Sequence, residues 1–161
     1  MEIDYERIIN VLVAAGVEFI IVGGAAATAH GSSRLTTDLD VVYSREPKNI
    51  ERLVSALEPL QPKLRCASEG LPFRWDDETV KKGLNFTLMT SAGALDLWGE
   101  IIGGGGYEQL APDSISLTVF GNECLCLGLE RLIQVKQAAG RSKDHETIKE
   151  LKVILQERYS R

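Results

Sequence analysis

The stretch VGGAAATAHGSSRLTTDLDVVY, residues 22–43, places two glycines at the end of one apolar run and two aspartates, one residue apart, at the start of the next. The preceding VEFIIVG predicts a buried strand, and LDVVY predicts a second strand. Between them, Ala25–His30 predicts a short helix and SSRLTTD a polar loop. Because side chains alternate along a strand, Asp38 and Asp40 point to one face while Leu39 points into the core. The stretch therefore predicts a strand–helix–strand unit with two carboxylates on one face.

The carboxylate pair indicates a metal site. Two ionised carboxylates this close repel each other, and a bound Mg²⁺ removes that penalty because it prefers oxygen ligands, substrate phosphates among them. A solvated pair, or a pair neutralised by Arg34, is the alternative. Gly23 and Gly24 favour the metal, since their backbone can approach a phosphate closely and the helix start at Ala25 offers free N–H groups. For either glycine alone, a turn with positive φ is a sufficient explanation.

The order strand, Gly-Gly, helix, Asp-x-Asp resembles that of the nucleotidyltransferases of the DNA polymerase β superfamily, in particular small bacterial members related to abortive-infection toxins and antibiotic nucleotidyltransferases. Gly23-Gly24 and Asp38-Leu39-Asp40 match the pattern. The family adds a third carboxylate on a later strand, and Asp96 in ALDLW is the best match; a half-exposed strand aspartate is the alternative for it. The resemblance implies an α/β (α+β) fold in which a mixed β-sheet is flanked by helices.

The same resemblance implies an activity. An acceptor hydroxyl attacks the α-phosphate of a nucleoside triphosphate (NTP), pyrophosphate leaves, and two Mg²⁺ or Mn²⁺ ions assist. Two ions a few Å apart stabilise both the attacking and the departing oxygen, which explains the need for three carboxylates. By resemblance, Asp38 and Asp40 hold the ion that travels with the triphosphate, and Asp96 holds the ion that lowers the pKa of the acceptor hydroxyl.

The polar loop between the glycines and the aspartates contains Arg34, Thr36 and Thr37. Similar small transferases often carry an arginine followed by a hydroxyl residue here, so Arg34 and Thr37 are candidate nucleotide-binding residues. Arg34 could contact phosphate, brace Asp40, or be an ordinary surface arginine. His30 ends the Ala-rich helix, where a histidine suits the helix dipole, and is not assigned as a catalytic base.

A lysine on the inner face of a helix is a second candidate phosphate ligand. Leu129, Leu132 and Ile133 define that face, and the i, i+3, i+4, i+7 pattern continues to Lys136. Such a lysine must extend its ammonium to solvent or meet an anion, and the triphosphate is a suitable anion. The following RSKDHETI resembles an Arg-x-Lys/Arg-Asp segment of toxin-type relatives, although Asp144 also suits a helix cap.

Capping residues and apolar spacing predict four further helices and two hairpins. One helix is capped by Asp4, and a second has Pro47 in its first turn. Two more helices cover about 129–139 and 144–159, and the hairpins cover 84–101 and 114–128. The apolar residues of 61–82 show no reliable helical or strand periodicity. Gly103–Gly106 predicts a loop, either a lid beside the nucleotide or a flexible connection.

Composition predicts one domain over residues 1–161, with the C-terminal helices at about 129–159 packed on the sheet. The three cysteines are expected to be reduced core residues, because Cys124 and Cys126 lack the second ligand pair of a zinc site. A net charge of −5 argues against tight nonspecific binding to nucleic acid. A local basic patch still leaves a nucleic-acid end open as a substrate; it comprises Arg131, Lys136, Arg141 and Lys143.

The expected function is metal-dependent transfer of a nucleoside monophosphate. The acceptor is open between a tRNA 3′ end, a protein side chain and a small molecule. A catalytically idle nucleotide-binding or partner-binding module of the same fold is the alternative, and a toxin–antitoxin pair is one setting for such a module. A second copy of the chain or an antitoxin or toxin partner is expected to complete the cleft, since no large acceptor-binding segment is evident. A cytoplasmic location is expected, because the N-terminus is acidic and no apolar run approaches the roughly 18 residues of a membrane span.

Overall fold

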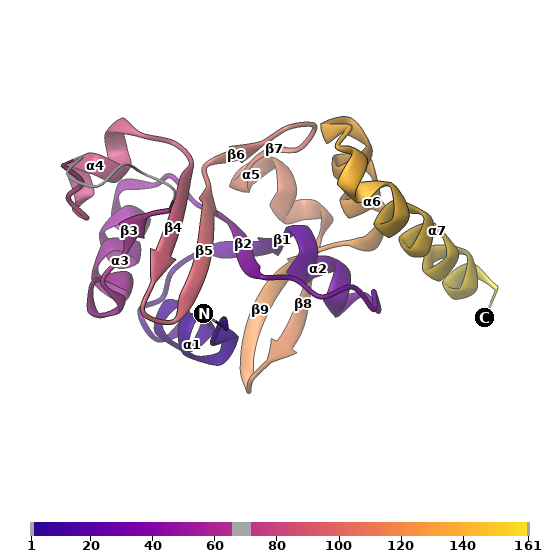
Figure 1. Cartoon of the computed structure of the whole chain (residues 1–161), viewed down its shortest axis with the longest axis horizontal. Helices are drawn as coiled ribbons and strands as arrows, with labels where there is room; N and C mark the ends of the chain where they lie inside the picture. Colours follow the sequence, from indigo (N-terminus) through magenta and orange to yellow (C-terminus); the bar gives the residue numbers. More distant parts are fainter. Residues whose placement is uncertain (1, 66–71, 161) are drawn as a thin grey trace.

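The computed structural model describes residues 2–65 and 72–160. Its centre is a seven-stranded mixed sheet with strand order β3-β4-β5-β2-β1-β9-β8, and β6 and β7 form a separate two-stranded sheet (Figure 1). The strands are β1 Phe19–Val22, β2 Asp38–Tyr43, β3 Lys63–Leu64, β4 Phe86–Thr90, β5 Gly93–Trp98, β6 Glu100–Ile101, β7 Gly105–Gly106, β8 Ser114–Val119 and β9 Asn122–Leu127. The helices are α1 Tyr5–Ala14, α2 Gly23–Ala29, α3 Pro47–Leu57, α4 Asp77–Lys82, α5 Tyr107–Leu110, α6 Leu129–Ala139 and α7 His145–Tyr159. The predicted α/β class with a helix-flanked mixed sheet is confirmed.

Local sequence signals account for most element boundaries. The carboxylate of Asp4 accepts a hydrogen bond from the Arg7 backbone N–H at 3.0 Å and so caps α1. Gly16, with φ of +74°, reverses the chain after this helix. Pro47 lies in the first turn of α3, where its missing N–H costs no hydrogen bond.

Two expectations are corrected, and the structure assigns elements in a region where the sequence predicted none. Helix α2 begins at Gly23 rather than Ala25, so both glycines belong to its first turn. Gly103–Gly106 is not wholly a loop, because Gly105–Gly106 pairs with Glu100–Ile101 as the strands β7 and β6. The region without a reliable period contains β3 and α4, while residues 66–71 of that region, with the third cysteine, lie outside the described part of the chain.

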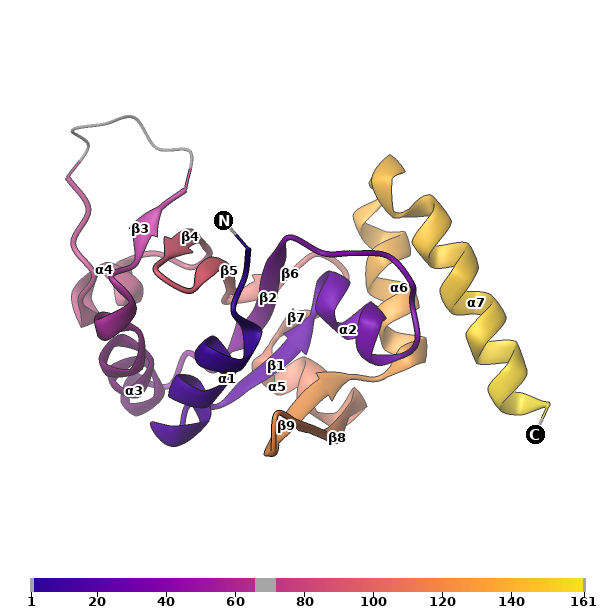
Figure 2. The same ribbon diagram turned by 60° about the horizontal axis from the view of Figure 1, so that its bottom comes forward.

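The two faces of the sheet differ in chemistry. One face carries the fully buried Leu39 and Leu95. Helices α1 and α3 contact each other and lie side by side (Figure 2). The other face carries Asp38, Asp40 and Asp96, which strand alternation places opposite those leucines. An apolar layer therefore supports one side of the strands that present the carboxylates on the other.

The two C-terminal helices lie at one end of the molecule, where α7 packs along α6 (Figure 1). Glu150 of α7 accepts hydrogen bonds from the hydroxyls of Ser32 at 2.6 Å and Ser33 at 2.9 Å. Arg158, near the end of α7, donates to the carbonyl of His30 at 3.3 Å. These contacts tie α7 to the loop that leads from α2 into β2. Within residues 2–65 and 72–160, no helix combines the length and the apolar character that crossing a membrane requires.

A buried asparagine joins α3 to the ends of β1 and β2. The side chain of Asn49 is 1% exposed and makes three hydrogen bonds. Its Oδ1 accepts from the Glu18 N–H at 2.7 Å, and its Nδ2 donates to the carbonyls of Glu18 at 3.1 Å and Ser44 at 2.8 Å. Asn49 is thereby the partner of the Glu18 N–H and of the Ser44 carbonyl, and it shares the Glu18 carbonyl with the Ser44 N–H.

We expect Asn49→Ala to lower the free energy of unfolding by about 2–4 kcal/mol, because it removes the Asn49 partner of the Glu18 N–H and of the buried Ser44 carbonyl. Lys48→Ala, an exposed change on the same helix, is the matched control and should shift it by less than about 0.5 kcal/mol. Urea unfolding followed by circular dichroism measures both. Equal stability of the two variants would show that the Asn49 hydrogen bonds are dispensable.

Candidate active site

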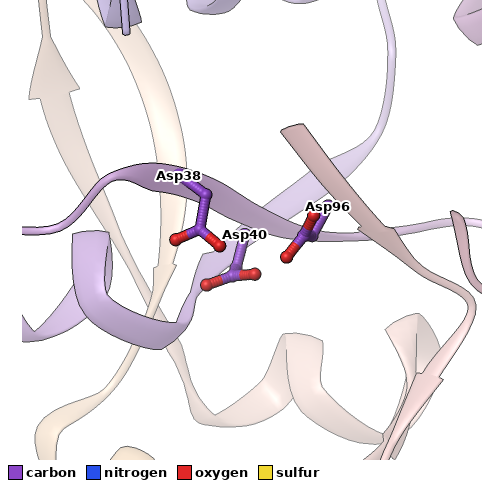
Figure 3. Close-up of side chains that lie close together, drawn as sticks. All are labelled: Asp38, Asp40 and Asp96. Carbon is purple, nitrogen blue, oxygen red and sulfur yellow. The ribbon is translucent and has the colours of Figure 1, made fainter. Parts of the chain in front are cut away.

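Three carboxylates converge because three strands pair in register. Asp40 on β2 pairs with Val22 of β1 on one side and with Asp96 of β5 on the other, and Asp38 pairs with Ala94. Figure 3 shows Asp38, Asp40 and Asp96 pointing toward a common point. Each offers one carboxylate oxygen, and these three oxygens lie within 4.8 Å of one another. Asp96 thus lies on the same face as the Asp-x-Asp pair.

The electrostatics of the cluster reflect negative charge held close together. Burial, followed by repulsion from Asp38 and Asp96, raises the pKa of Asp40 to about 7, although the indole of Trp98 opposes the rise by donating to Asp40 Oδ1 at 3.2 Å. Burial also raises the pKa of Asp96, against the lowering effect of its hydrogen bond from Arg65. The protein alone therefore does not neutralise the cluster.

The donor set fits a hard divalent cation. Mg²⁺ and Mn²⁺ prefer carboxylate oxygens, and a bound ion would supply the positive charge that Asp40 otherwise obtains by holding a proton. Asp38 and Asp40 on one strand, with Asp96 on its neighbour, are the residues that could hold it.

The glycine pair lies against the carboxylates. Gly23 has φ of +63°, and a Cβ at this position would collide with Asp40 Oδ2. A Cβ on Gly24 would lie 3.0 Å from the side chain of Thr36. Thr36 Oγ1 donates to the Asp38 carbonyl at 2.9 Å and reaches Asp38 Oδ1 at 3.2 Å. The glycines therefore let α2 start directly beside the two aspartates, a close approach that any side chain would prevent.

Arg65 directly follows β3. Among the described residues, it is the cation that forms ion pairs with the carboxylate cluster. Its Nη2 lies 2.7 Å from Asp96 Oδ1 and 3.8 Å from Asp38 Oδ2. Its Nη1 donates to the Leu88 carbonyl on β4 at 3.0 Å. Arg65 therefore balances part of the charge of the cluster from the side opposite Gly23.

A cavity of about 290 Å³ opens beside Asp40, toward α6. Gly23, Trp98, Glu100, Ile101 and Lys136 are among the residues that line it. The cavity combines an apolar wall with groups that can hold phosphate or metal, a combination typical of a small-molecule site.

Lys136 lies on the inner face of α6, as the helical spacing predicted, and is 5% exposed. Its ammonium lies 3.5 Å from Asp144 Oδ1, while Arg141 donates to Asp144 Oδ2 at 2.8 Å. Asp144 occupies the N-cap position of α7, but its side chain makes no capping hydrogen bond there. It is instead a buried counter-ion that holds both cations at the wall of the cavity.

The loop candidates lie elsewhere. Arg34 is exposed and lines a different hollow together with Leu35 and Thr36, and it forms no ion pair with any described residue. Thr37 is exposed, and Thr36 is the threonine that contacts Asp38. His30 is buried, with its Nε2 2.8 Å from the Leu127 carbonyl.

Sequence reasoning did not find Arg65, Trp98 and Thr36 as contacts of the carboxylates. Trp98 could have been predicted from the sequence, because it follows Asp96 by two residues and strand alternation places both on one face. Arg65 could not, because it lies in the region whose apolar residues show no helical or strand periodicity. It becomes a neighbour only through pairing of β3 with β4 and of β4 with β5.

The sequence matches no protein-family model and no curated protein. Solved structures to which its structure is similar include three that are each 14% identical in sequence. The lincosamide antibiotic adenylyltransferase LnuA, with lincomycin bound, aligns over 96% of this chain and 99% of its own, with a TM-score of 0.64. A candidate nucleotidyltransferase from Thermotoga maritima aligns over 89% and 87%, with a TM-score of 0.57.

The third structure, ANT(2")-Ia in complex with adenylyl-2"-tobramycin, aligns over 95% of both chains with a TM-score of 0.53. These alignments extend over nearly the whole of each chain, and so include the central sheet that carries the carboxylates. We conclude that this chain has the nucleotidyltransferase fold.

Proposed function

We propose that this protein transfers a nucleoside monophosphate from an NTP to an acceptor hydroxyl and releases pyrophosphate, with Mg²⁺ or Mn²⁺ as the metal. The observation that carries the proposal is the convergence of Asp38, Asp40 and Asp96 within 4.8 Å, beside a cavity lined by Gly23 and Lys136. A purely structural domain has no need for this arrangement, because three close carboxylates destabilise the fold unless a ligand offsets their repulsion.

Each group around the cavity has a separate role. Asp38 and Asp40 hold the ion that accompanies the triphosphate, and Asp96 holds the ion next to the acceptor. When bound, the ions polarise the α-phosphate and lower the pKa of the attacking hydroxyl. The backbone at Gly23 and Gly24 lets a phosphate approach Asp40 closely, since no side chain stands in the way.

Two cations flank the expected triphosphate. Lys136 of α6 lines the cavity, and its ammonium pairs with Asp144. Arg141 lines the same cavity and shares this counter-ion. Because Asp144 fixes both cations before substrate binds, less conformational entropy is lost on binding the anion.

The acceptor is a hydroxyl compound, and small molecules are the first class to test, since LnuA binds lincomycin and ANT(2")-Ia is in complex with adenylyl-2"-tobramycin. A tRNA 3′ end, a protein side chain and a toxin or antitoxin partner remain further candidates. The alternative function is an idle binding module of the same fold. Three intact carboxylates favour an enzyme, because nucleotide binding alone does not require Asp96.

The test is incubation of the full chain with α-³²P-labelled NTPs, Mg²⁺ or Mn²⁺, and separate pools of lincosamides, aminoglycosides, total RNA and cell lysate. We expect label to move to one pool and to stay in the NTP when Asp96→Asn replaces the wild type. Tight Mg-NTP binding without label in any pool would support the idle binding module instead.

Substitutions within the trio should separate binding from chemistry. Asp38→Asn and Asp40→Asn should weaken Mg-NTP binding, because both residues hold the ion that travels with the triphosphate. Asp96→Asn should retain most Mg-NTP affinity but lose transfer by several orders of magnitude. Calorimetric titration and the transfer assay measure the two effects. Near-normal transfer by Asp96→Asn would move the role to another carboxylate, such as Glu100, which lines the cavity.

The stabilisation of the fold by Mg²⁺ should depend on pH, because Asp40 titrates. The pKa of this carboxyl in the folded protein is about 7, above its ordinary value of 3.8. Its protonation therefore stabilises the metal-free fold fully below pH 3.8, and this contribution is lost as the pH rises through about 7. An ion must displace that proton, so Mg²⁺ should raise Tm more at pH 8 than at pH 6.

Thermal unfolding with and without Mg²⁺ at the two pH values measures this difference. Asp40→Asn should remove it, whereas Asp113→Asn, a change at an exposed site on another segment, should retain it. A Tm increase that is the same at both pH values in the wild type would contradict the assignment.

Lys136→Met should weaken NTP binding by about 1.5–3 kcal/mol, the typical loss for a charge-assisted contact. Asp144→Asn removes the partner of Lys136 but keeps the ammonium, so it should lower stability while retaining most of the affinity. Titration with a non-hydrolysable NTP, alongside Tm, compares the variants. Equal losses of affinity would assign Lys136 to pairing with Asp144 alone.

A further inference from the structure

The guanidinium of Arg65 stands between two of the three carboxylates. Its Nη2 is 2.7 Å from Asp96 Oδ1 and 3.8 Å from Asp38 Oδ2, and its side chain is 24% exposed. The shorter contact is a charge-assisted hydrogen bond of the stronger kind. The position between these two oxygens is therefore held by a cation that belongs to the protein.

Arg65 is held there from two directions. While Nη2 contacts Asp96, Nη1 donates to the Leu88 carbonyl of β4 at 3.0 Å. Leu88 also pairs in register with Leu64, the residue before Arg65, so the anchor and the arginine come from adjacent strands. A planar guanidinium can make both contacts at once, which the single ammonium of a lysine cannot do in the same geometry.

The other carboxylate oxygens have different surroundings. Asp38 Oδ1 meets the hydroxyl of Thr36, and Asp40 Oδ1 meets the indole of Trp98. Asp40 Oδ2 faces Gly23, at the cavity. The donors to Asp38 Oδ1 and Asp40 Oδ1 are therefore neutral, whereas the donor to Asp96 Oδ1 carries a full positive charge.

We propose that Arg65 occupies the place of the acceptor-side cation and controls its entry. The inference rests on the function proposed above. One ion binds at Asp38 and Asp40 while Arg65 stays in place. A second ion that takes Asp96 Oδ1 as a ligand enters only when Arg65 gives up that oxygen, because a divalent ion and a guanidinium that share one oxygen ligand repel each other.

This assignment makes Arg65 a positioning residue with a regulatory effect. It keeps Asp96 oriented toward the other carboxylates in the absence of the second ion, and it separates the binding of the two ions into a tight and a weak step. The acceptor would then reach a site to which the second ion has not yet bound.

The test counts bound ions with the metal alone. Full-length wild type is titrated with Mn²⁺ at fixed pH, and free Mn²⁺ is measured by electron paramagnetic resonance. We expect one tight ion in the wild type, and in Arg65→Gln a second ion bound about tenfold or more tighter than in the wild type, the size expected for removal of a competing charge-assisted contact. Lys63→Gln is the matched control, since it removes one positive charge from an exposed site on the same strand and should behave like the wild type.

A melting curve for each variant shows that it is folded. Arg65→Lys keeps the charge and gives a second reading should Arg65→Gln not fold: it should continue to suppress the second ion. Two equally tight ions in the wild type would overturn the inference and leave the proposed function intact, as would a single ion in folded Arg65→Gln. Absence of Mn²⁺ binding in all four proteins would overturn the proposed function itself.

Discussion

The structure depends on one constraint, the in-register pairing of β1, β2 and β5, which places Asp40 beside Asp96. Pairing brings the carboxylates together whatever their mutual repulsion, because backbone hydrogen bonds and the buried leucines on the opposite face set the register. A shift by one residue would send the carboxylates into the core and the leucines to the cavity. The apolar layer is therefore what forces the acidic cluster to form.

The remaining features of the site offset the cost of that cluster. Arg65 supplies a positive charge on one side, Trp98 and Thr36 supply neutral hydrogen bonds, and the raised pKa of Asp40 shows that these contacts leave charge to be compensated. A divalent cation is the natural complement of what is left. Under the proposed function, this imbalance links the stability of the fold to metal binding.

The glycine pair and Lys136 serve the site from the other side. Gly23 permits α2 to start against Asp40, and Asp144 keeps Lys136 at the wall of the cavity. Both depend on close packing between segments distant in sequence, since Asp144 comes from the junction of α6 and α7 and Asp40 from β2. Helices α2 and α6 therefore border the cavity, whereas strands β2 and β5 present the carboxylates.

The sequence by itself determined the strand–glycine–helix–strand unit, the common face of Asp38 and Asp40, and the inward position of Lys136. Each follows from a period of 2 or 3.6 residues over a short segment. Only the tertiary structure decided that Arg65, rather than Arg34, contacts the carboxylates, that Thr36 rather than Thr37 meets Asp38, and that Asp144 pairs with Lys136. The contacts of Arg65 and Lys136 depend on which strands lie next to each other and on how the last helices turn. Such contacts join segments whose own periodicity carries no information about their partners.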